Sequence, residues 1–64
     1  MKNTEADRLH FESLCKADRP FPLDTTRQGE GYLYPVTNRF WYGYQHTGEY
    51  GVVFRNNQFI QDKN

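Results

Sequence analysis

Most of the large apolar residues in this chain are aromatic, and that limits what it can fold into. Its 64 residues include five Phe, five Tyr and one Trp, whereas Leu, Val and Ile together number only eight. Aromatic rings must therefore supply much of the buried area. A chain this short buries only about 60% of the surface that its unfolded form exposes. We therefore expect one small domain over residues 1–64, without a deep enclosed active site.

The charges of the chain balance, with eight Lys and Arg against eight Asp and Glu. A neutral domain exerts no long-range attraction on phosphate backbones or anionic membranes. No apolar run approaches the length of a membrane span, and the polar start of the sequence differs from a secretory signal. The single cysteine, Cys15, allows no internal disulfide, which is typical of a reducing compartment. We expect a cytoplasmic protein whose partner is another protein, with no membrane association.

The first segment has the pattern of an amphipathic helix from Thr4 to Ala17. Thr4 offers an N-cap, and acidic residues follow in the first turn, where the helix dipole favours them. At 100° per residue one apolar face gathers Phe11, Leu14 and Cys15, and Leu9 lies off it. The proline and glycine content of residues 19–31 then predicts a long loop, with Phe21 and Leu23 held against the core.

Residues 32–45 fit two different structures. As strands, Tyr32–Tyr34 would pair with Arg39–Tyr44 across a Pro-Val-Thr-Asn turn, as their β propensity favours. As a helix, the segment would be capped by Thr37. The face toward the core would then carry Phe40, Trp41 and Tyr44. The outward face would carry Arg39, Tyr42 and Gly43. The choice between them decides the fold.

The C-terminal segment predicts a β-hairpin. Two β-rich runs, residues 50–54 and 58–61, flank Asn56-Asn57, a dipeptide that tolerates the positive φ of a tight turn. A two-residue loop would pair Phe54 with Phe59 and Val53 with Ile60. The hairpin would leave two open edges, which together with the aromatic surplus favour a homo-oligomer.

Several short motifs keep a regular spacing along residues 9–46. In chain order they are Phe11-Glu12, Pro22-Leu23-Asp24, Gly31-Tyr32, Thr37, Trp41 and Gly43-Tyr44-Gln45. This pattern resembles that of many small uncharacterised accessory proteins of enterobacterial tailed phages and prophages. There, Phe-Glu closes a first helix and Thr-x-x-x-Trp-x-Gly-Trp opens a second, whereas here Thr follows Asp24 in place of the usual Arg, and Tyr44 replaces the second Trp. The resemblance implies a helix over residues 37–46, a phage or prophage origin and a host cytoplasm as location, and that family carries no established activity.

We accordingly predict an α+β fold. It comprises a helix over Thr4–Ala17, a long loop, a short second helix capped by Thr37 and a C-terminal β-hairpin. Either Phe54 or Val53 of the hairpin packs against Phe11, Leu14 and Trp41. The alternative is one helix packed on a three- or four-stranded antiparallel meander.

The sequence contains no pattern of catalytic or metal-binding residues. His10 and Cys15 are five residues apart on the predicted helix, so their side chains point about 140° from each other. The set His10, Glu12, Cys15 and His46 lacks the spacing of known zinc sites. We predict no enzymatic activity, no cofactor and no metal.

The candidate partner-binding residues are Tyr34, Arg39, Trp41 and Tyr42, because large aromatic and Arg side chains dominate protein interfaces. If the segment is helical, Arg39 and Tyr42 face outward and Trp41 joins the core. If it is a strand, Arg39 and Trp41 share a face instead. The resulting hypothesis is a phage-encoded protein that binds a host protein, such as a defence factor, and modulates or inhibits it without catalysis. The alternative is a nucleic-acid-binding accessory module that uses exposed aromatics, although the basic residues form no stripe.

Overall fold

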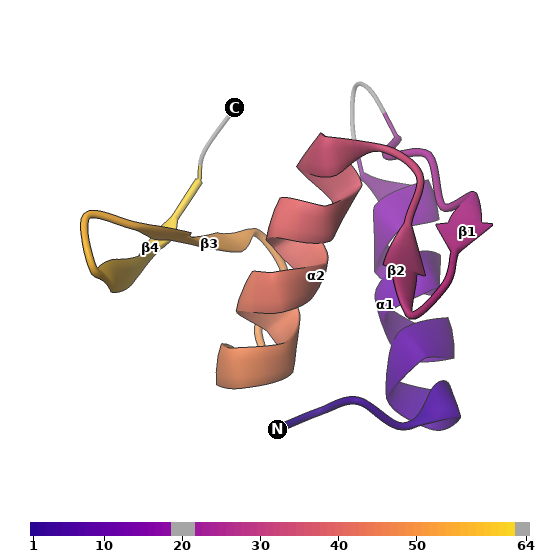
Figure 1. Ribbon diagram of the computed structural model, residues 1–64, viewed down its shortest axis with the longest axis horizontal. Helices are drawn as coiled ribbons and strands as arrows, with labels where there is room; N and C mark the ends of the chain where they lie inside the picture. The colour runs from indigo at the N-terminus through magenta and orange to yellow at the C-terminus, as the bar shows by residue number, and fades with distance from the viewer. Residues whose placement is uncertain (19–21, 63–64) are drawn as a thin grey trace.

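The structure is a computed structural model that describes residues 1–18 and 22–62, and it has an α+β architecture (Figure 1). In chain order the elements are α1 (Glu5–Ala17), β1 (Arg27–Gln28), β2 (Gly31–Tyr32), α2 (Pro35–Thr47), β3 (Val52–Arg55) and β4 (Gln58–Gln61). The predicted α+β fold with two helices and a C-terminal hairpin is confirmed, and the meander alternative is wrong. The predicted core contact of Phe21 lies outside the described residues.

Helix α1 begins and ends where the sequence indicates. The Thr4 hydroxyl accepts from the Asp7 backbone N–H at 3.1 Å, and the Asp7 carboxylate accepts from the Thr4 N–H at 3.2 Å. This reciprocal capping box satisfies two N–H groups that the first turn would otherwise leave unpaired. Phe11 and Cys15 are fully buried, whereas Leu9 is exposed, as the helical periodicity predicts.

Residues 35–47 form a helix, which resolves the ambiguity of this segment, but Thr37 does not cap it. The helix starts earlier because Pro35 supplies a fixed φ at the first helical position, and Tyr34 is the N-cap, without a side-chain cap bond. Thr37 lies inside the helix and is buried, and its hydroxyl donates to the Asp24 carbonyl at 2.7 Å. Thr37 therefore fastens the preceding loop to α2.

That loop contains a small hairpin that the sequence analysis missed. Arg27 pairs with Tyr32 and Gln28 with Gly31, around a turn at Gly29 with φ 59°. The Asn38 side chain of α2 accepts from the Tyr32 N–H at 2.7 Å and donates to the Tyr32 carbonyl at 2.6 Å. Because these bonds come from a side chain on α2, two-residue strands form where propensity alone predicts a loop.

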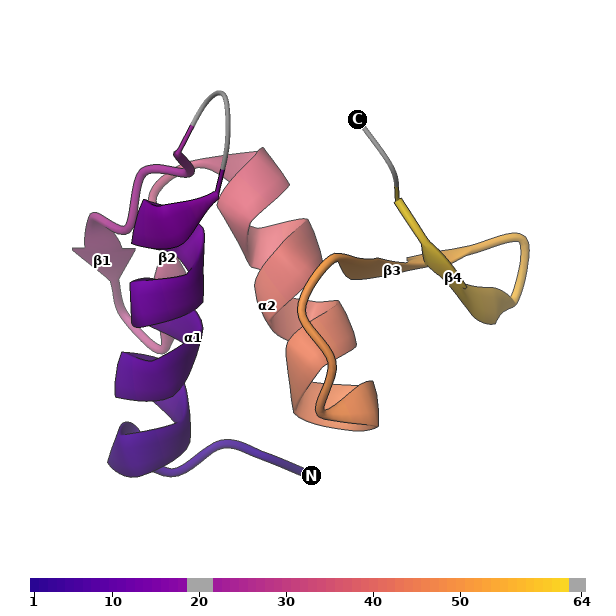
Figure 2. The ribbon, with the colours of Figure 1, turned by 180° about the vertical axis from the view of Figure 1, so that it is seen from behind.

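The C-terminal hairpin has the predicted register. Phe54 pairs with Phe59 and Val53 with Ile60, and both turn residues have positive φ, 54° at Asn56 and 63° at Asn57. These angles correspond to the type I′ turn that matches strand twist. The hairpin projects from α2 on the side away from α1 (Figures 1 and 2).

The core is aromatic, as the composition requires. The Phe11 ring lies at its centre, 5.0 Å from the Trp41 ring centroid, 5.5 Å from Tyr44 and 5.6 Å from Tyr32. Val53 enters this cluster, whereas Phe54 remains about half exposed. Of the two hairpin residues offered for the core, Val53 is therefore the one that packs there, and Phe54 faces the opposite way.

Candidate functional site

The structure separates the residues predicted to bind a partner. Arg39 and Tyr42 are exposed, and Tyr42 is 46% exposed, as the helical alternative predicts. Tyr34, also 46% exposed, precedes the first turn of α2, eight residues before Tyr42 and so about 12 Å away along the helix axis. Trp41 is 5% exposed and belongs to the core cluster, so its side chain offers a partner little surface.

A second group of aromatic rings lies outside the core, where α2 meets the C-terminal hairpin. We call it the outer aromatic face, and it consists of Tyr42, His46, Phe54 and Phe59. The Tyr42 ring centroid lies 4.3 Å from His46 and 5.9 Å from Phe59. Phe59 in turn lies 5.4 Å from His46 and 5.0 Å from Phe54. Each ring contacts others of the group, so the face is one continuous cluster.

A close backbone contact at Gly43 brings the two halves of this face together. A Cβ atom added at Gly43 would lie 1.7 Å from the carbonyl oxygen of Val52, so only glycine allows β3 to lie this close to α2. The sequence analysis placed Gly43 on the outward side, and that prediction is wrong, because β3 covers it. Tyr42 and His46, one turn apart, then lie beside one face of the hairpin.

Hairpin geometry explains why this face is apolar. Side chains alternate along a strand, so Val53 and Ile60 share the face toward the core, and Phe54 and Phe59 share the other. The sequence analysis paired Phe54 with Phe59 and so contained the signal for this second face. It did not indicate that Tyr42 and His46 lie beside it, because that depends on the contact at Gly43.

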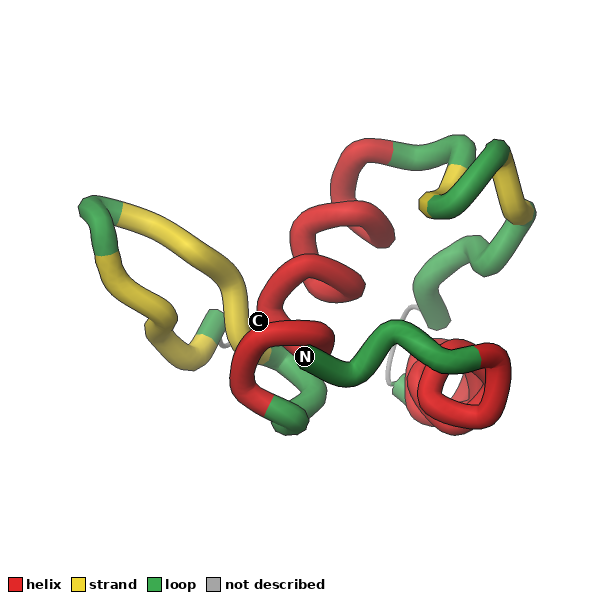
Figure 3. Tube along the Cα trace, turned by 60° about the horizontal axis from the view of Figure 1, so that its bottom comes forward, coloured by secondary structure: helices red, strands yellow, loops and turns green. Residues whose placement is uncertain are grey.

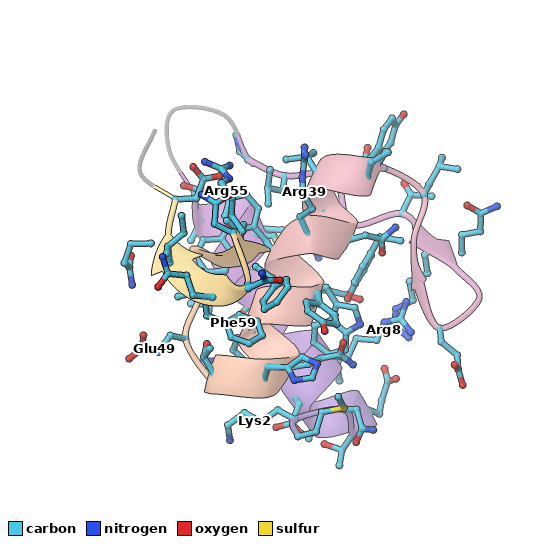
Figure 4. The ribbon with its side chains drawn as sticks, turned by 60° about the vertical axis from the view of Figure 1, so that its left-hand side comes forward. Lys2, Arg8, Arg39, Glu49, Arg55 and Phe59 are labelled. Atoms are coloured by element: carbon cyan, nitrogen blue, oxygen red, sulfur yellow. The ribbon has the colours of Figure 1, made fainter. Side chains whose placement is uncertain are left out.

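Charged side chains lie on either side of Phe59. In Figure 4, Arg39 and Arg55 lie on one side of Phe59, and Lys2 and Glu49 lie on the other. Within residues 1–18 and 22–62, neither Arg39 nor Arg55 takes part in an ion pair. Arg39, one turn before Tyr42 on α2, therefore remains available beside the outer aromatic face, whereas Arg55 lies on the strand face of Val53.

Three charged residues of α1 are, by contrast, engaged with β1 and β2: Glu5, Arg8 and Glu12. The Arg27 guanidinium bonds to Glu12 and to Glu5, each at 2.8 Å, and the Tyr32 hydroxyl donates to Glu12 at 3.0 Å. Arg8 donates to the Gly31 carbonyl and to the Tyr32 hydroxyl. Burial raises the pKa of Tyr32 to about 12, and the bond from Arg27 lowers the pKa of Glu5. This network is structural, because its donors and acceptors bind one another.

A cavity of about 190 Å³ opens beside this network. Its walls include Arg8, Glu30 and Trp41. The Arg8 guanidinium is already bound to Gly31, Tyr32 and Glu12, and no buried side-chain polar atom among the described residues lacks a hydrogen-bond partner. The basic group in the cavity wall is therefore already engaged, and no buried polar atom among the described residues is left for a ligand.

Two reactive side chains of α1, Cys15 and His10, do not contact each other. Burial raises the pKa of the Cys15 thiol to about 12, so the thiolate nucleophile is suppressed. The His10 imidazole contacts the Tyr44 hydroxyl at 2.7 Å instead of Cys15. In the part of the chain that the structure describes, no three His, Cys, Asp or Glu residues could hold a metal ion together.

Comparisons with known proteins returned no similar protein. No family model matches the chain, and no curated protein or solved structure matches it. Within the described residues, neither helix is long and apolar enough to cross a membrane. The outer aromatic face is an accessible apolar cluster to which both α2 and the C-terminal hairpin contribute.

Proposed function

We propose that this chain is a small phage-encoded protein that binds a host protein through the outer aromatic face and modulates or inhibits it without catalysis. One observation carries the proposal: aromatic rings from α2 and from the hairpin meet on the outside of the fold. Two of them, Tyr42 and Phe54, are about half exposed, although their rings pack against one another. In a domain with so few apolar residues, leaving these outside the core costs stability that a binding role would explain.

The packing of the face supports binding. Tyr42 and His46 both stack on Phe59, at interplanar angles of 25°. Rings that are already held by neighbours lose little conformational entropy when a partner arrives. Aromatic residues and Arg are also the types that contribute most to protein interfaces, and Arg39 lies one turn before Tyr42. The face thus combines a fixed apolar centre with a charged edge.

The phage origin and the host partner come from the sequence. The Gly31-Tyr32 and Thr-x-x-x-Trp-x-Gly motifs supply the resemblance to phage accessory proteins. A noncatalytic protein of this size acts by occupying a surface of its target, and host defence factors are one class of target. The balanced net charge favours a protein over a polyanion as partner.

The test is capture of the partner from a bacterial host lysate with tagged wild-type chain, Tyr42→Ala and Phe54→Ala. Tyr34→Ala is the matched control, because Tyr34 and Tyr42 are the same residue type and are equally exposed. We expect Tyr42→Ala or Phe54→Ala to weaken binding of a stoichiometric protein by about tenfold or more, as for an interface hot spot. Tyr34→Ala should leave it unchanged.

The opposite pattern would contradict the proposal. If Tyr34→Ala abolished capture while folded Tyr42→Ala and Phe54→Ala bound normally, the partner would contact the start of α2, and the initial assignment of Tyr34 would stand instead. Circular dichroism of each variant separates loss of binding from loss of folding.

The runner-up function, binding of single-stranded nucleic acid, is favoured by the exposed rings beside Arg39. Base stacking on aromatic side chains would use the same face. Nuclease treatment of the lysate distinguishes the two, because a bound protein survives it and a nucleic-acid bridge does not. Steep weakening with salt would also indicate a nucleic acid.

A further inference from the structure

The hydrogen-bond pattern of the C-terminal hairpin determines which of its backbone groups are unpaired. The Asp62 N–H donates to the Gly51 carbonyl at 2.8 Å, so this residue pair bonds across the hairpin. Along antiparallel strands such bonded pairs alternate with pairs whose N–H and C=O groups point away. With Val53 opposite Ile60, the backbone of Ile60 points toward β3, and the backbone groups of Phe59 and Gln61 point outward from β4.

The two edges of the hairpin differ in what covers them. Helix α2 lies against the β3 edge, because the outward carbonyl of Val52 faces Gly43. The expectation of two open edges is therefore wrong for β3. Beyond β4, no strand among residues 1–18 and 22–62 pairs with the Phe59 and Gln61 groups, since the sheet is two-stranded. In Figure 3 the hairpin stands out from the helices.

The β4 edge also lacks the features by which monomeric proteins block edge pairing. Strands at free edges usually carry a charge, a proline or a bulge. β4 reads Gln-Phe-Ile-Gln, without charge or proline, and its pairing with β3 is continuous over the strand. By contrast, the edge strand β1 carries Arg27, whose charge is engaged with α1.

We propose that β4 pairs antiparallel with β4 of a second copy of this chain. The strand edge favours this occupant, because a second copy presents the same outward groups at Phe59 and Gln61, and β4 carries no charge that would repel its own copy. With Ile60 of one copy opposite Ile60 of the other, Phe59 and Gln61 of each copy exchange backbone hydrogen bonds with Gln61 and Phe59 of the other. The outward groups of both edges are then satisfied, and the two hairpins become one continuous sheet.

This pairing has a geometric consequence. The two-fold axis that relates the two strands runs perpendicular to the sheet. Equivalent faces of the two hairpins therefore lie on the same side of the combined sheet. Phe54 and Phe59 of both copies then lie on the same side, and the two outer aromatic faces become neighbours. The pairing uses the strand edge and leaves these faces uncovered, so it does not depend on host-protein binding.

The test is the mass of the wild-type chain in solution by sedimentation equilibrium across a concentration series, without any partner. We expect twice the 7.7 kDa mass at high concentration. Gln61→Pro removes an N–H that points away from β3, so it spares the hairpin and removes a bond from the pairing. It should weaken dimerisation on the order of tenfold or more, since both copies lose it. Gln61→Ala, which keeps the N–H, should dimerise like the wild type.

Hydrogen exchange of the wild-type chain gives an independent answer, even if Gln61→Pro does not fold. The amides of Phe59 and Gln61 should become protected as concentration rises, whereas those of Gln58 and Ile60 should be protected throughout. A chain that stays monomeric at millimolar concentration would overturn the proposal. So would a folded Gln61→Pro variant that dimerises as tightly as the wild type.

Discussion

The two hairpins of this protein are attached to their helices by different kinds of contact. Besides the Tyr32 ring, which packs in the core, the β1–β2 hairpin is held to α1 by charged side chains, with Arg27 bonded to Glu5 and Glu12. The β3–β4 hairpin is held to α2 by ring packing and by the backbone contact at Gly43. Both hairpins end up fixed, and the second carries exposed aromatic rings at its junction with the helix.

This difference shows how a small domain obtains a binding surface. A polar attachment consumes its own donors and acceptors, so nothing is left for a partner. An apolar attachment buries only the side chains that lie between the two elements. Rings just beyond that contact stay exposed to solvent. The two hairpins should therefore respond to different perturbations.

The largest effect is expected from Gly43→Ala. In an isolated helix this change stabilises by about 1 kcal/mol. Here the added Cβ would collide with the Val52 carbonyl, so we expect a loss of about 3 kcal/mol and detachment of β3–β4. Urea unfolding followed by circular dichroism measures it. Val36→Ala, exposed on the same helix, should change stability by less than about 0.5 kcal/mol, and stabilisation by Gly43→Ala would disprove the close contact.

A smaller effect, confined to the other hairpin, is expected from Glu12→Gln. The Glu12 side chain is 12% exposed and accepts from Arg27 and Tyr32. Removing the Glu12 charge leaves the equally buried Arg8 without its ion-pair partner. We expect this to lower the free energy of unfolding by about 2 kcal/mol. Urea unfolding measures the cost, and the matched Glu5→Gln variant should lose clearly less, because Glu5 is well exposed. Equal losses would show that burial of Glu12 does not matter.

The smallest effect is the acid dependence of the β1–β2 attachment. The Arg27 bond lowers the pKa of Glu5 below its ordinary 4.5, so the carboxylate contributes stability above that value. This contribution is lost as the pH falls through the lowered pKa of the folded state. The free energy of unfolding, measured from neutral pH to about pH 2, should therefore decrease less steeply with falling pH for Glu5→Gln than for the wild type. An unchanged slope would show that the Glu5–Arg27 bond contributes nothing in solution.

Much of the fold follows from local rules. Thr4 and Asp7 cap α1, the spacing of Phe11 and Cys15 defines its buried face, and Asn56-Asn57 sets the register of the C-terminal hairpin. Each depends on residues a few positions apart. The site was predicted less well: exposure of Tyr42 followed from helical periodicity, but Phe54, Phe59 and His46 were not assigned to it.

The failures share a cause, which is contact between distant segments. Thr37 suits an N-cap, yet its hydroxyl bonds to Asp24, thirteen residues earlier in the chain. The β1–β2 strands depend on Asn38 of α2. Gly43 faces outward on an isolated helix and is buried only because β3 crosses it. No local pattern contains these partners.

The sequence by itself determined that the core is aromatic, where the first helix and the last hairpin lie, and which hairpin residues oppose each other. These properties depend on composition and on periodicities of two and 3.6 residues. Only the tertiary structure decided which aromatics are core and which form a surface. The side of α2 on which the hairpin packs depends on a single close approach at Gly43, and close approach is a property of two segments together.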